Sequence, residues 1–197
     1  MDNVLAHPRI GIFGGSFNPI HVGHIGLARQ LLSLASLDEV WFLVSPLNPF
    51  KKAATDLLDD EKRLLIAREA LEGEQKLKVS DYEFHLPKPS YTWNTLRHLQ
   101  ADYPTCHFVL VIGADNWLAF DHWAHPDYIL ANFEIAVYAR PNCVIDPAAL
   151  PHNVRFFKTR LYDVSSTAIR ENIKNGLPIS GLVPDHVEGL ITESYRK

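Results

Sequence analysis

The chain has 197 residues, of which 47% are hydrophobic and 21% are charged, and its mean hydropathy is -0.08. These values are typical of a soluble globular protein, and the length suits a single domain over residues 1–197. A formal net charge of -4 and a pI of about 6.2 argue against a protein that wraps nucleic acid or binds a membrane through a polybasic surface. A local basic pocket for a phosphorylated small molecule stays compatible with this charge, because net charge says little about a cleft.

Cysteine content and the N-terminal sequence indicate a cytoplasmic protein. Only Cys106 and Cys143 are present, and neither stands in a CxxC or Cys/His metal-binding spacing. The first residues, MDNVLAHPR, lack a basic segment followed by an apolar run, and no apolar stretch approaches the length of a membrane span. We therefore expect a cytoplasmic location, no structural disulfide and no membrane partner, and the sequence is compatible with a homo-oligomer.

Short apolar runs alternate with segments of helical periodicity along the chain. In the first half we expect strands at 9–14, 39–45, 77–81 and 107–112, with helices from about 21, at 59–72 and at 91–101. In the second half we expect a helical stretch near 115–131, strands at 133–138 and near 154–158, a helix from about 166 to 175 and a C-terminal helix after Pro184. This alternation predicts an α/β fold, a Rossmann-like doubly wound parallel sheet with helices on both faces.

Residues that carry chemistry follow four of the predicted strands, in the ranges 14–24, 48–51, 113–115 and 163–170. In an open parallel sheet, ligands bind outside the carboxyl ends of the strands. We therefore expect these segments to meet at one edge of the sheet and to form the functional site.

The segment GGSFNPIHVGH after the first strand leaves three interpretations open. Gly14 and Gly15 permit backbone dihedrals and a close ligand approach that residues with a Cβ resist, and Pro19 shapes the turn into the following helix. His21 and His24 are three residues apart, so they share one face of that helix beside an N-terminus that favours anions. A phosphate cradle fits this pattern, and plain packing or helix capping is the ordinary alternative. A zinc site fits less well, because two histidines do not complete a tetrahedral set of ligands.

The segment VSSTAIR places Ser165, Ser166 and Thr167 at the start of a predicted helix, with Arg170 one turn later. Taken alone, this pattern is ordinary helix capping by hydroxyls together with a solvated arginine. Beside the first segment it suits a bound phosphate group, because a helix N-terminus attracts anions and a guanidinium binds phosphate as a fork.

Four segments together resemble a known enzyme family. GGSFNPIHVGH resembles the GGSFxPxHxGH signature of the nucleotidyltransferases that carry an HxGH motif. VSSTAIR, SYTWNTLRHL at 90–99 and GADNWLAFDHW at 113–123 resemble segments of the nicotinate and nicotinamide mononucleotide adenylyltransferases, with the bacterial nicotinate enzymes as the best match. The resemblance covers 14–170 and implies adenylyl transfer from ATP to nicotinate mononucleotide, which gives deamido-NAD and pyrophosphate in NAD biosynthesis.

The resemblance implies roles for named residues at the phosphate end of the site. His21, His24 and Arg170 are the expected catalytic residues, which bind the ATP phosphates and stabilise the transition state at the α-phosphorus. The other expected phosphate-binding residues are Gly14, Gly15, Ser16, Phe17, Lys51, Ser165, Ser166 and Thr167. Family members commonly carry a His-Lys pair where this chain has Phe50 and Lys51, so no histidine role transfers to position 50. Lys52 is the alternative to Lys51 as the phosphate contact.

The resemblance also implies where the sugar and the acceptor bind. Gly113 and Asp115 are expected at a nucleotide ribose, although Asp115 suits capping of the following helix nearly as well. The turn formed by Ser90, Tyr91 and Thr92 is expected to face the pyridine carboxylate. Whether the acceptor is the nicotinate or the nicotinamide compound depends on backbone geometry that the sequence does not reveal.

One tryptophan is expected to stack on the pyridine ring. The resemblance assigns this role to Trp123, because an aromatic face suits a flat, electron-poor ring. A buried core position is the alternative for Trp123, and Trp93 and Trp117 are close enough in sequence to compete for the role.

The implied reaction needs hydrogen-bond donors and cations but no general base. The nucleophile is a phosphomonoester whose second pKa is about 6, so it is mostly ionised at neutral pH and attacks in line without a covalent enzyme intermediate. Mg²⁺ is expected to arrive bound to the ATP phosphates, and the sequence shows no carboxylate cluster that would predict a protein metal ligand. The expected partners are ATP and nicotinate mononucleotide, with no nucleic acid.

Other functions with a similar signature stay open. The acceptor could be nicotinamide mononucleotide or phosphopantetheine instead, although VSSTAIR and SYTWNTL speak against the phosphopantetheine and cytidylyl enzymes. Class I aminoacyl-tRNA synthetases share an HxGH-type signature, but this chain is short and acidic and lacks a KMSKS-like loop. A non-catalytic nucleotide sensor is a further alternative, which the presence of both histidines and Arg170 disfavours.

Overall fold

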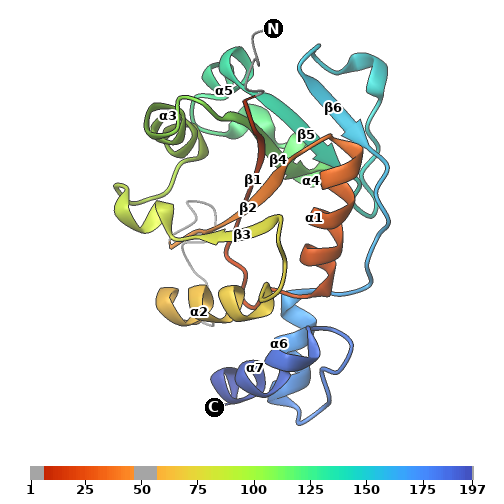
Figure 1. The fold of residues 1–197 in the computed structure, drawn as a ribbon. Helices are drawn as coiled ribbons and strands as arrows, with labels where there is room; N and C mark the ends of the chain where they lie inside the picture. The colour runs from red at the N-terminus through yellow and green to blue at the C-terminus, as the bar shows by residue number, and fades with distance from the viewer. Residues whose placement is uncertain (1–6, 47–56, 197) are drawn as a thin grey trace, which may run out of the picture.

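The computed structural model describes residues 7–46 and 57–196, which build a six-stranded parallel sheet with helices around it (Figure 1). The strands are β1 (Arg9–Gly15), β2 (Glu39–Val44), β3 (Leu77–Ser80), β4 (His107–Gly113), β5 (Glu134–Tyr138) and β6 (Val154–Phe157). The α-helices are α1 (Val22–Leu34), α2 (Asp60–Ala70), α3 (Thr92–Asp102), α4 (Ala114–Leu118), α5 (Pro126–Asn132), α6 (Ser166–Lys174) and α7 (Glu188–Tyr195). Short 3-10 segments in the described residues are η2 (Tyr82–His85), η3 (Phe120–His122), η4 (Pro147–Ala149) and η5 (Asp185–Val187).

The strands lie in the order β3-β2-β1-β4-β5-β6, and every neighbouring pair is parallel. The chain moves outward from β1 to β3 and then crosses to the other side of β1 with β4, so the connections after β1 and β4 run in opposite directions. Such a reversal is the switch point of a doubly wound sheet, where a crevice opens at the carboxyl edge. The predicted Rossmann-like α/β class is confirmed, and the predicted strands agree with the structure to within one residue.

Hydrophobic side chains cover both faces of the sheet, which explains why the strands are nearly continuous apolar runs. On one face, Phe13 and Val111 belong to a core that includes residues of α1, α2, α6 and α7. On the other face, Ile12 and Leu110 belong to a core that includes residues of α3, α4 and α5. Neighbours such as Ile12 and Phe13 face opposite cores because side chains alternate along a strand.

The helical stretch that the sequence predicts near 115–131 is divided in the structure into α4, η3 and α5. His125 has a φ of 52° and stands directly before Pro126, the first residue of α5. Proline lacks an N–H and disfavours the helical region for the residue before it, so one continuous helix cannot pass this point. The stretch is helical as expected, but in three separate segments, and Pro126 marks the start of the last one.

The helix predicted at 59–72 is confirmed as α2, and its start shows why the sequence favours it. The Asp59 carboxylate accepts hydrogen bonds from the backbone N–H groups of Glu61 and Lys62, at 3.1 and 3.4 Å. An aspartate in this position satisfies donors that the first helical turn leaves unpaired, and its charge suits the positive end of the helix dipole.

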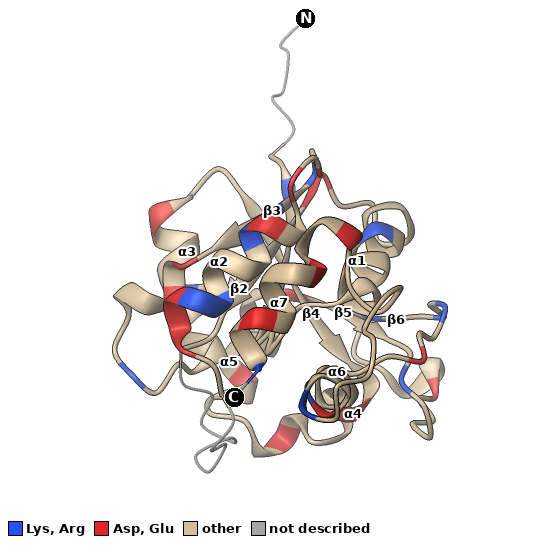
Figure 2. Cartoon of the chain, turned by 90° about the horizontal axis from the view of Figure 1, so that it is seen from below, with Lys and Arg blue, Asp and Glu red and all other residues tan. Residues whose placement is uncertain are grey.

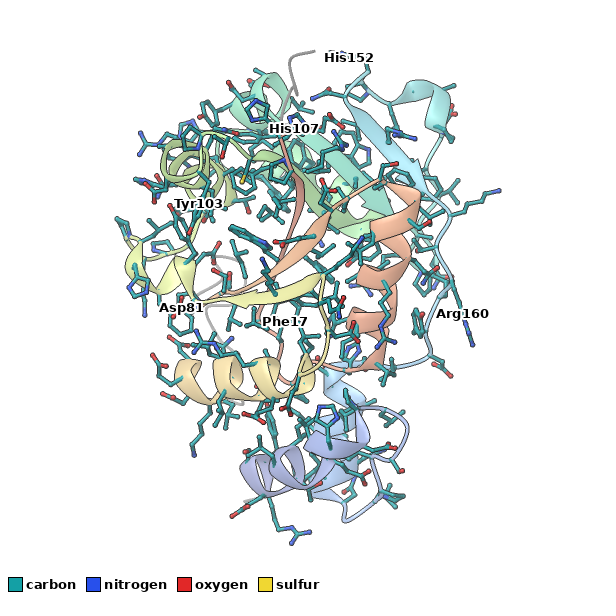
Figure 3. All side chains as sticks on the ribbon, viewed as in Figure 1. Phe17, Asp81, Tyr103, His107, His152 and Arg160 are labelled. Atoms are coloured by element: carbon teal, nitrogen blue, oxygen red, sulfur yellow. The ribbon has the colours of Figure 1, made fainter. Side chains whose placement is uncertain are left out.

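Charged side chains are spread over the surface instead of forming one positive field. Figure 2 shows basic and acidic positions interspersed over α2, α6 and α7. At the amino edge of the sheet, Arg9 and Glu134 form an ion pair of 3.0 Å, and His107 Nε2 lies 2.9 Å from the same carboxylate. Figure 3 shows His107 at this edge and Phe17 at the opposite, carboxyl edge. Within the residues that the structure describes, no helix is long and apolar enough to cross a membrane.

Candidate active site

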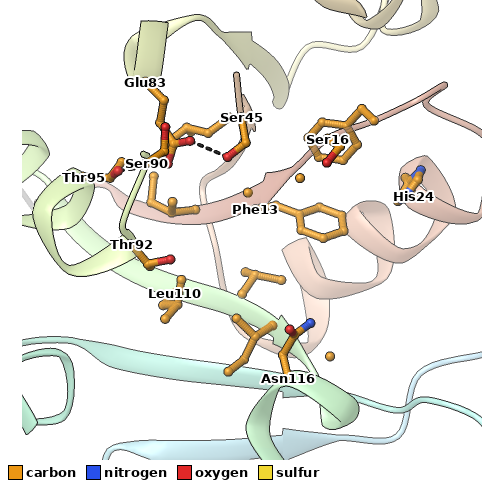
Figure 4. A pocket seen from close by; sticks show the side chains of 18 of the residues that line it. Phe13, Ser16, His24, Ser45, Glu83, Ser90, Thr92, Thr95, Leu110 and Asn116 are labelled. Atoms are coloured by element: carbon orange, nitrogen blue, oxygen red, sulfur yellow. Dashed lines mark hydrogen bonds between the residues drawn. The ribbon is translucent and has the colours of Figure 1, made fainter. Parts of the chain in front are cut away.

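A cavity of about 590 Å³ lies at the carboxyl edge of the sheet, at the switch point between β1 and β4. Its walls come from the ends of β1, β2, β4 and β5 and from the first turns of α3 and α6. Figure 4 shows His24 near one end of the cavity and Glu83 near the other. Three of the four segments that the sequence predicts to meet therefore do meet, and the fourth, 48–51, lies outside the described residues.

The turn after β1 forms one wall of the cavity. Gly14 and Gly15 belong to β1 itself, and the residue of this turn with a positive φ is Phe17, at 43°. A Cβ on Gly14 meets no atom within 4 Å, whereas a Cβ on Gly15 comes within 2.9 Å of the Phe17 ring. The expectation that the glycines provide unusual dihedrals is therefore wrong. Close approach of a ligand fits Gly14, which borders open space, and close packing of Phe17 explains Gly15.

His21 and His24 lie together at the start of α1. Their rings are stacked, with centroids 3.6 Å apart and planes 25° apart. His24 lines the cavity and contacts the edges of the Phe13 and Phe17 rings, with centroids 6.1 and 5.2 Å away. His21 is the residue before the first turn of α1, is only 7% exposed, and lies behind its partner. The prediction that the two histidines share one face of the helix is confirmed. Only His24 is among the residues that line the cavity.

The environment of His21 favours its neutral form. Burial, and to a smaller extent the positive charge of Arg140, lowers the pKa of the His21 imidazole from 6.5 to about 4. Its Nδ1 atom is buried and has no hydrogen-bond partner among the described residues. At neutral pH His21 is therefore an uncharged imidazole, able to donate one hydrogen bond and not to act as a cation.

The turn after β1 is fastened to α6 and α7 through Asn18 and Pro19. Arg170 Nη1 donates to the Asn18 carbonyl at 2.8 Å, and Ser166 Oγ donates to the Pro19 carbonyl at 2.8 Å. The Asn18 side-chain oxygen accepts from the Tyr195 hydroxyl at 2.6 Å. The two segments that the sequence assigned to phosphate binding are thus joined directly, across more than 140 residues of chain.

The hydroxyls at the start of α6 divide into two groups. Ser165 Oγ accepts from the Ala168 N–H at 3.1 Å, so its helix-capping interpretation is confirmed. Ser166, Thr167 and Arg170 line the cavity, where they stand beside the first residues of a nine-residue helix. The structure therefore places these three at the predicted phosphate end, whereas Ser165 caps the helix and is not among the residues that line the cavity.

Ser90, Tyr91 and Thr92 line the opposite end of the cavity, where Tyr91 immediately precedes α3. The floor between the two ends is apolar and includes Ile12 and Leu110 of the central strands. A flat ring fits such a floor, since it offers dispersion contacts without unpaired polar groups. The placement of the 90–92 turn thus agrees with its predicted location, and its contact with a pyridine carboxylate stays a prediction.

The structure separates the three competing tryptophans. Trp123 lines the cavity. Trp123 also packs against Phe120, at 5.3 Å between centroids, and so does Trp117 on the same ring at 5.2 Å, but Trp117 is not among the residues that line the cavity. Trp93 lies 4.4 Å from the His125 ring. Among the described residues, Trp123 is therefore the tryptophan placed to contact a ligand in this cavity.

Asp115 and Arg140 form an ion pair on the cavity wall, with Arg140 Nε 3.5 Å from Asp115 Oδ1. Gly113 precedes them at the end of β4, and a Cβ there comes within 2.3 Å of the Asp115 carboxylate. Sequence reasoning assigned Gly113 and Asp115 to a ribose but missed Arg140, which follows β5 and lies 5.3 Å from the Tyr138 ring centroid. The available signal was a cation directly after a predicted strand, which is the same rule that located the other segments.

Two buried charged residues near the cavity were also missed. Arg63 of α2 is fully buried, donates to the carbonyls of Ser16 and Ser45, and pairs with Asp60 at 2.6 Å. Glu83 of η2 is 5% exposed and lines the cavity. The sequence carries no signal for either, because charged residues within periodic segments ordinarily face water.

The expected contact of Lys51 or Lys52 with phosphate lies outside the described residues and stays a prediction. Within 7–46 and 57–196, no group of three or more His, Cys, Asp or Glu side chains is placed to hold a metal ion. A divalent cation that enters this cavity with a nucleotide would meet the cations Arg140 and Arg170 as well as the Asp115 carboxylate.

Comparison with known proteins gives one consistent family. Residues 12–172 match the family described as cytidylyltransferase-like. A curated relative from Bacteroides fragilis, named "Probable nicotinate-nucleotide adenylyltransferase", is 48% identical over 175 residues, which cover 89% of this chain and 87% of the relative. A relative of the same name from Flavobacterium psychrophilum is 44% identical, with 96% of this chain and 100% of the relative covered.

Solved structures show the same architecture. A crystal structure described as "a Putative Nicotinate-nucleotide Adenylyltransferase from Vibrio parahaemolyticus" is 26% identical, covers 96% of both chains and has a TM-score of 0.67. The Plasmodium falciparum nicotinic acid mononucleotide adenylyltransferase complexed with NaAD covers 95% of this chain and 94% of its own, with a TM-score of 0.75 and 18% identity. At that identity, the second comparison supports the fold alone.

Proposed function

The chain belongs to the cytidylyltransferase-like family and, within it, to the nicotinate-nucleotide adenylyltransferases, and on this premise we propose how its cavity transfers the adenylyl group of ATP to nicotinate mononucleotide. The products are deamido-NAD and pyrophosphate. One observation carries the proposal. A single cavity joins the His24 and Arg170 wall to the wall formed by the 90–92 turn and Trp123. Two anionic substrates can therefore lie end to end across the switch point.

Direct attack suits the groups present in the cavity. The phosphate of the mononucleotide is its own nucleophile and is mostly ionised at neutral pH, so the step needs no general base. The bond between the α-phosphorus of ATP and the bridging oxygen breaks as the acceptor oxygen bonds to that phosphorus, and pyrophosphate leaves with the electron pair. Rate enhancement then comes from alignment of the two substrates and from stabilisation of charge on the α-phosphate.

At the phosphate end, His24, Thr167 and Arg170 are the proposed ligands of the triphosphate. They line the cavity beside the N-terminus of α6, whose free N–H groups favour an anion. His21 is buried, neutral and stacked on His24, so we assign it the role of holding the His24 ring in place and not that of a positive charge at the phosphate. Asp115 is the proposed partner of a ribose hydroxyl, with Arg140 holding the carboxylate in place.

At the acceptor end, Trp123 is the proposed stacking surface for the pyridine ring, and the backbone of the 90–92 turn is the proposed partner of its carboxylate. Mg²⁺ is proposed to enter with the ATP phosphates and to contribute charge neutralisation there. A cytoplasmic location also belongs to the proposal.

A pyrophosphate-release assay tests this function. The purified chain is given ATP and Mg²⁺ with nicotinate mononucleotide, nicotinamide mononucleotide or phosphopantetheine in parallel reactions. We expect the nicotinate compound to give the highest kcat/KM. Turnover with phosphopantetheine alone, or with none of the three acceptors, would overturn the proposal. A higher kcat/KM with the nicotinamide compound would retain the reaction and correct the acceptor.

A further inference from the structure

Glu83 is a buried carboxyl group at the acceptor end of the cavity that the proposed reaction leaves without a role. It belongs to η2, which connects β3 to the loop before α3, and it is 5% exposed. A carboxyl group in this setting loses hydration, and burial accordingly raises the pKa of Glu83. Such a group is costly unless other polar groups compensate it.

Hydroxyl groups from separate parts of the chain surround this carboxyl (Figure 4). Thr95 Oγ1 of α3 donates to Glu83 Oε1 at 2.9 Å, and Ser45 Oγ, directly after β2, donates to Oε2. Ser90 Oγ is buried near the same carboxyl and forms no hydrogen bond within the described residues, while the three hydroxyls lower the pKa that burial raises. Thr95 Oγ1 also lies 3.3 Å from the Tyr91 carbonyl. Glu83 thus connects the end of β2 to α3 and, through Thr95, to the 90–92 turn.

Ser45 is the fixed end of this connection. Its backbone N–H donates to the Gly15 carbonyl at 2.9 Å, and its own carbonyl accepts from Arg63 Nη1 and Nη2 at 3.1 Å each. Arg63 also donates to the Ser16 carbonyl in the turn at the phosphate end. These contacts hold Ser45 against the turn after β1, which forms the phosphate end of the cavity. Glu83 therefore links the 90–92 turn, through Ser45, to the phosphate end.

We propose that Glu83 is a positioning residue for the acceptor, which holds the 90–92 turn at a fixed distance from the phosphate-binding turn through Ser45 and Thr95. The inference rests on the proposed function, since it assumes that the 90–92 turn contacts the pyridine nucleotide. Glu83 itself takes no part in the transfer of the adenylyl group. Its loss should weaken acceptor binding far more than ATP binding.

Steady-state kinetics with Glu83→Ala test the assignment, with KM measured separately for nicotinate mononucleotide and ATP. We expect KM for the mononucleotide to rise by about tenfold or more and KM for ATP to change by less than about threefold. Thr95→Val keeps the carboxyl and nearly the same volume but removes one donor, and it should raise KM for the mononucleotide by about threefold. This second variant decides the question if Glu83→Ala does not fold.

Glu134→Ala is the matched control, because Glu134 is also a bridging carboxylate, bound to Arg9 and His107 at the far edge of the sheet. It should lower the unfolding temperature and leave both KM values as in the parent chain. Equal changes of both KM values in Glu83→Ala and Thr95→Val, or no change in either, would overturn the role of Glu83. If the parent chain turned over neither nicotinate mononucleotide nor nicotinamide mononucleotide, the proposed function would be overturned together with this inference.

Discussion

The rings of His21 and His24 are stacked 3.6 Å apart, yet His24 lines the cavity and His21 is buried behind it. Burial lowers the pKa of His21 to about 4, so this ring is neutral at neutral pH and is not the member of the pair that supplies positive charge. His24 is the ring that lines the cavity, where it can face an incoming phosphate. The stack therefore supports His24 as the member that meets negative charge.

Replacement of His24 by alanine should lower kcat by at least about tenfold, because it removes the ring that the cavity offers to the reacting phosphates, and such a loss corresponds to about 1.4 kcal/mol of barrier. Pyrophosphate release at saturating substrates measures the effect. His152→Ala is the matched control, since His152 is exposed and lies at the opposite edge of the sheet (Figure 3). A variant His24→Ala with kcat within a few-fold of the control would contradict the assigned role.

Replacement of Arg170 by lysine should raise KM for ATP by about fivefold to tenfold, because an ammonium group cannot bind phosphate as a fork. The same change removes the Nη1 contact that holds the Asn18 carbonyl, so the phosphate-binding turn also loses a support. Initial rates at varied ATP concentration give the value. Arg155→Lys, at an exposed position over the Phe157 ring, controls for the general effect of this substitution. Unchanged ATP kinetics in Arg170→Lys would remove Arg170 from the site.

The sequence predicted the strands and the edge at which the site lies, but not the charged residues that support it. A parallel sheet brings all strand carboxyl ends to one edge, so segments after β1 and β4 had to meet whatever their detailed geometry. Arg63 and Glu83 could not be found in this way, because only tertiary contacts bury them. The positive φ of Phe17 was missed because glycine is the ordinary residue for that conformation, and here the glycines precede it.

The tryptophans illustrate the same limit. Trp93, Trp117 and Trp123 lie within residues 93–123. Their spacing alone gives no reason to assign the stacking role to Trp123 and not to Trp117. The break between α4 and η3 separates these two residues, since Trp117 lies in α4 and Trp123 follows η3. Arg140, in contrast, was open to prediction, because it follows a strand that the sequence located correctly.

Replacement of Trp123 by leucine should raise KM for nicotinate mononucleotide by about tenfold, since loss of an aromatic stacking surface costs on the order of 1 kcal/mol or more. Trp117→Leu provides the comparison, because both tryptophans pack against Phe120 and the core, whereas Trp123 lines the cavity and Trp117 does not. That variant should lower the free energy of unfolding by about 2 kcal/mol and leave KM nearly unchanged. If Trp117→Leu gave the larger change in KM, the stacking role would belong to Trp117.

The buried His21 should make the protein less stable in mild acid. Its pKa is about 4 in the folded chain and 6.5 as the reference value, so below 6.5 the unfolded chain binds a proton that the folded chain does not. The contribution of His21 to the free energy of unfolding is therefore fully present above about pH 6.5, falls as the pH decreases, and no longer changes below about pH 4. Between about pH 7.5 and about pH 4.5, we expect it to contribute a loss of about 2 kcal/mol.

Urea unfolding of the parent chain and of His21→Asn at these two pH values isolates that contribution. Asparagine is a favoured residue before the first turn of a helix, so the variant keeps the start of α1 while removing the titrating ring. The parent chain should lose about 2 kcal/mol more than the variant on acidification, because all other titrating groups are common to both. Equal losses would show that His21 is protonated as readily in the folded chain as in the unfolded one, and the neutral, buried member of the histidine pair would have to be reassigned.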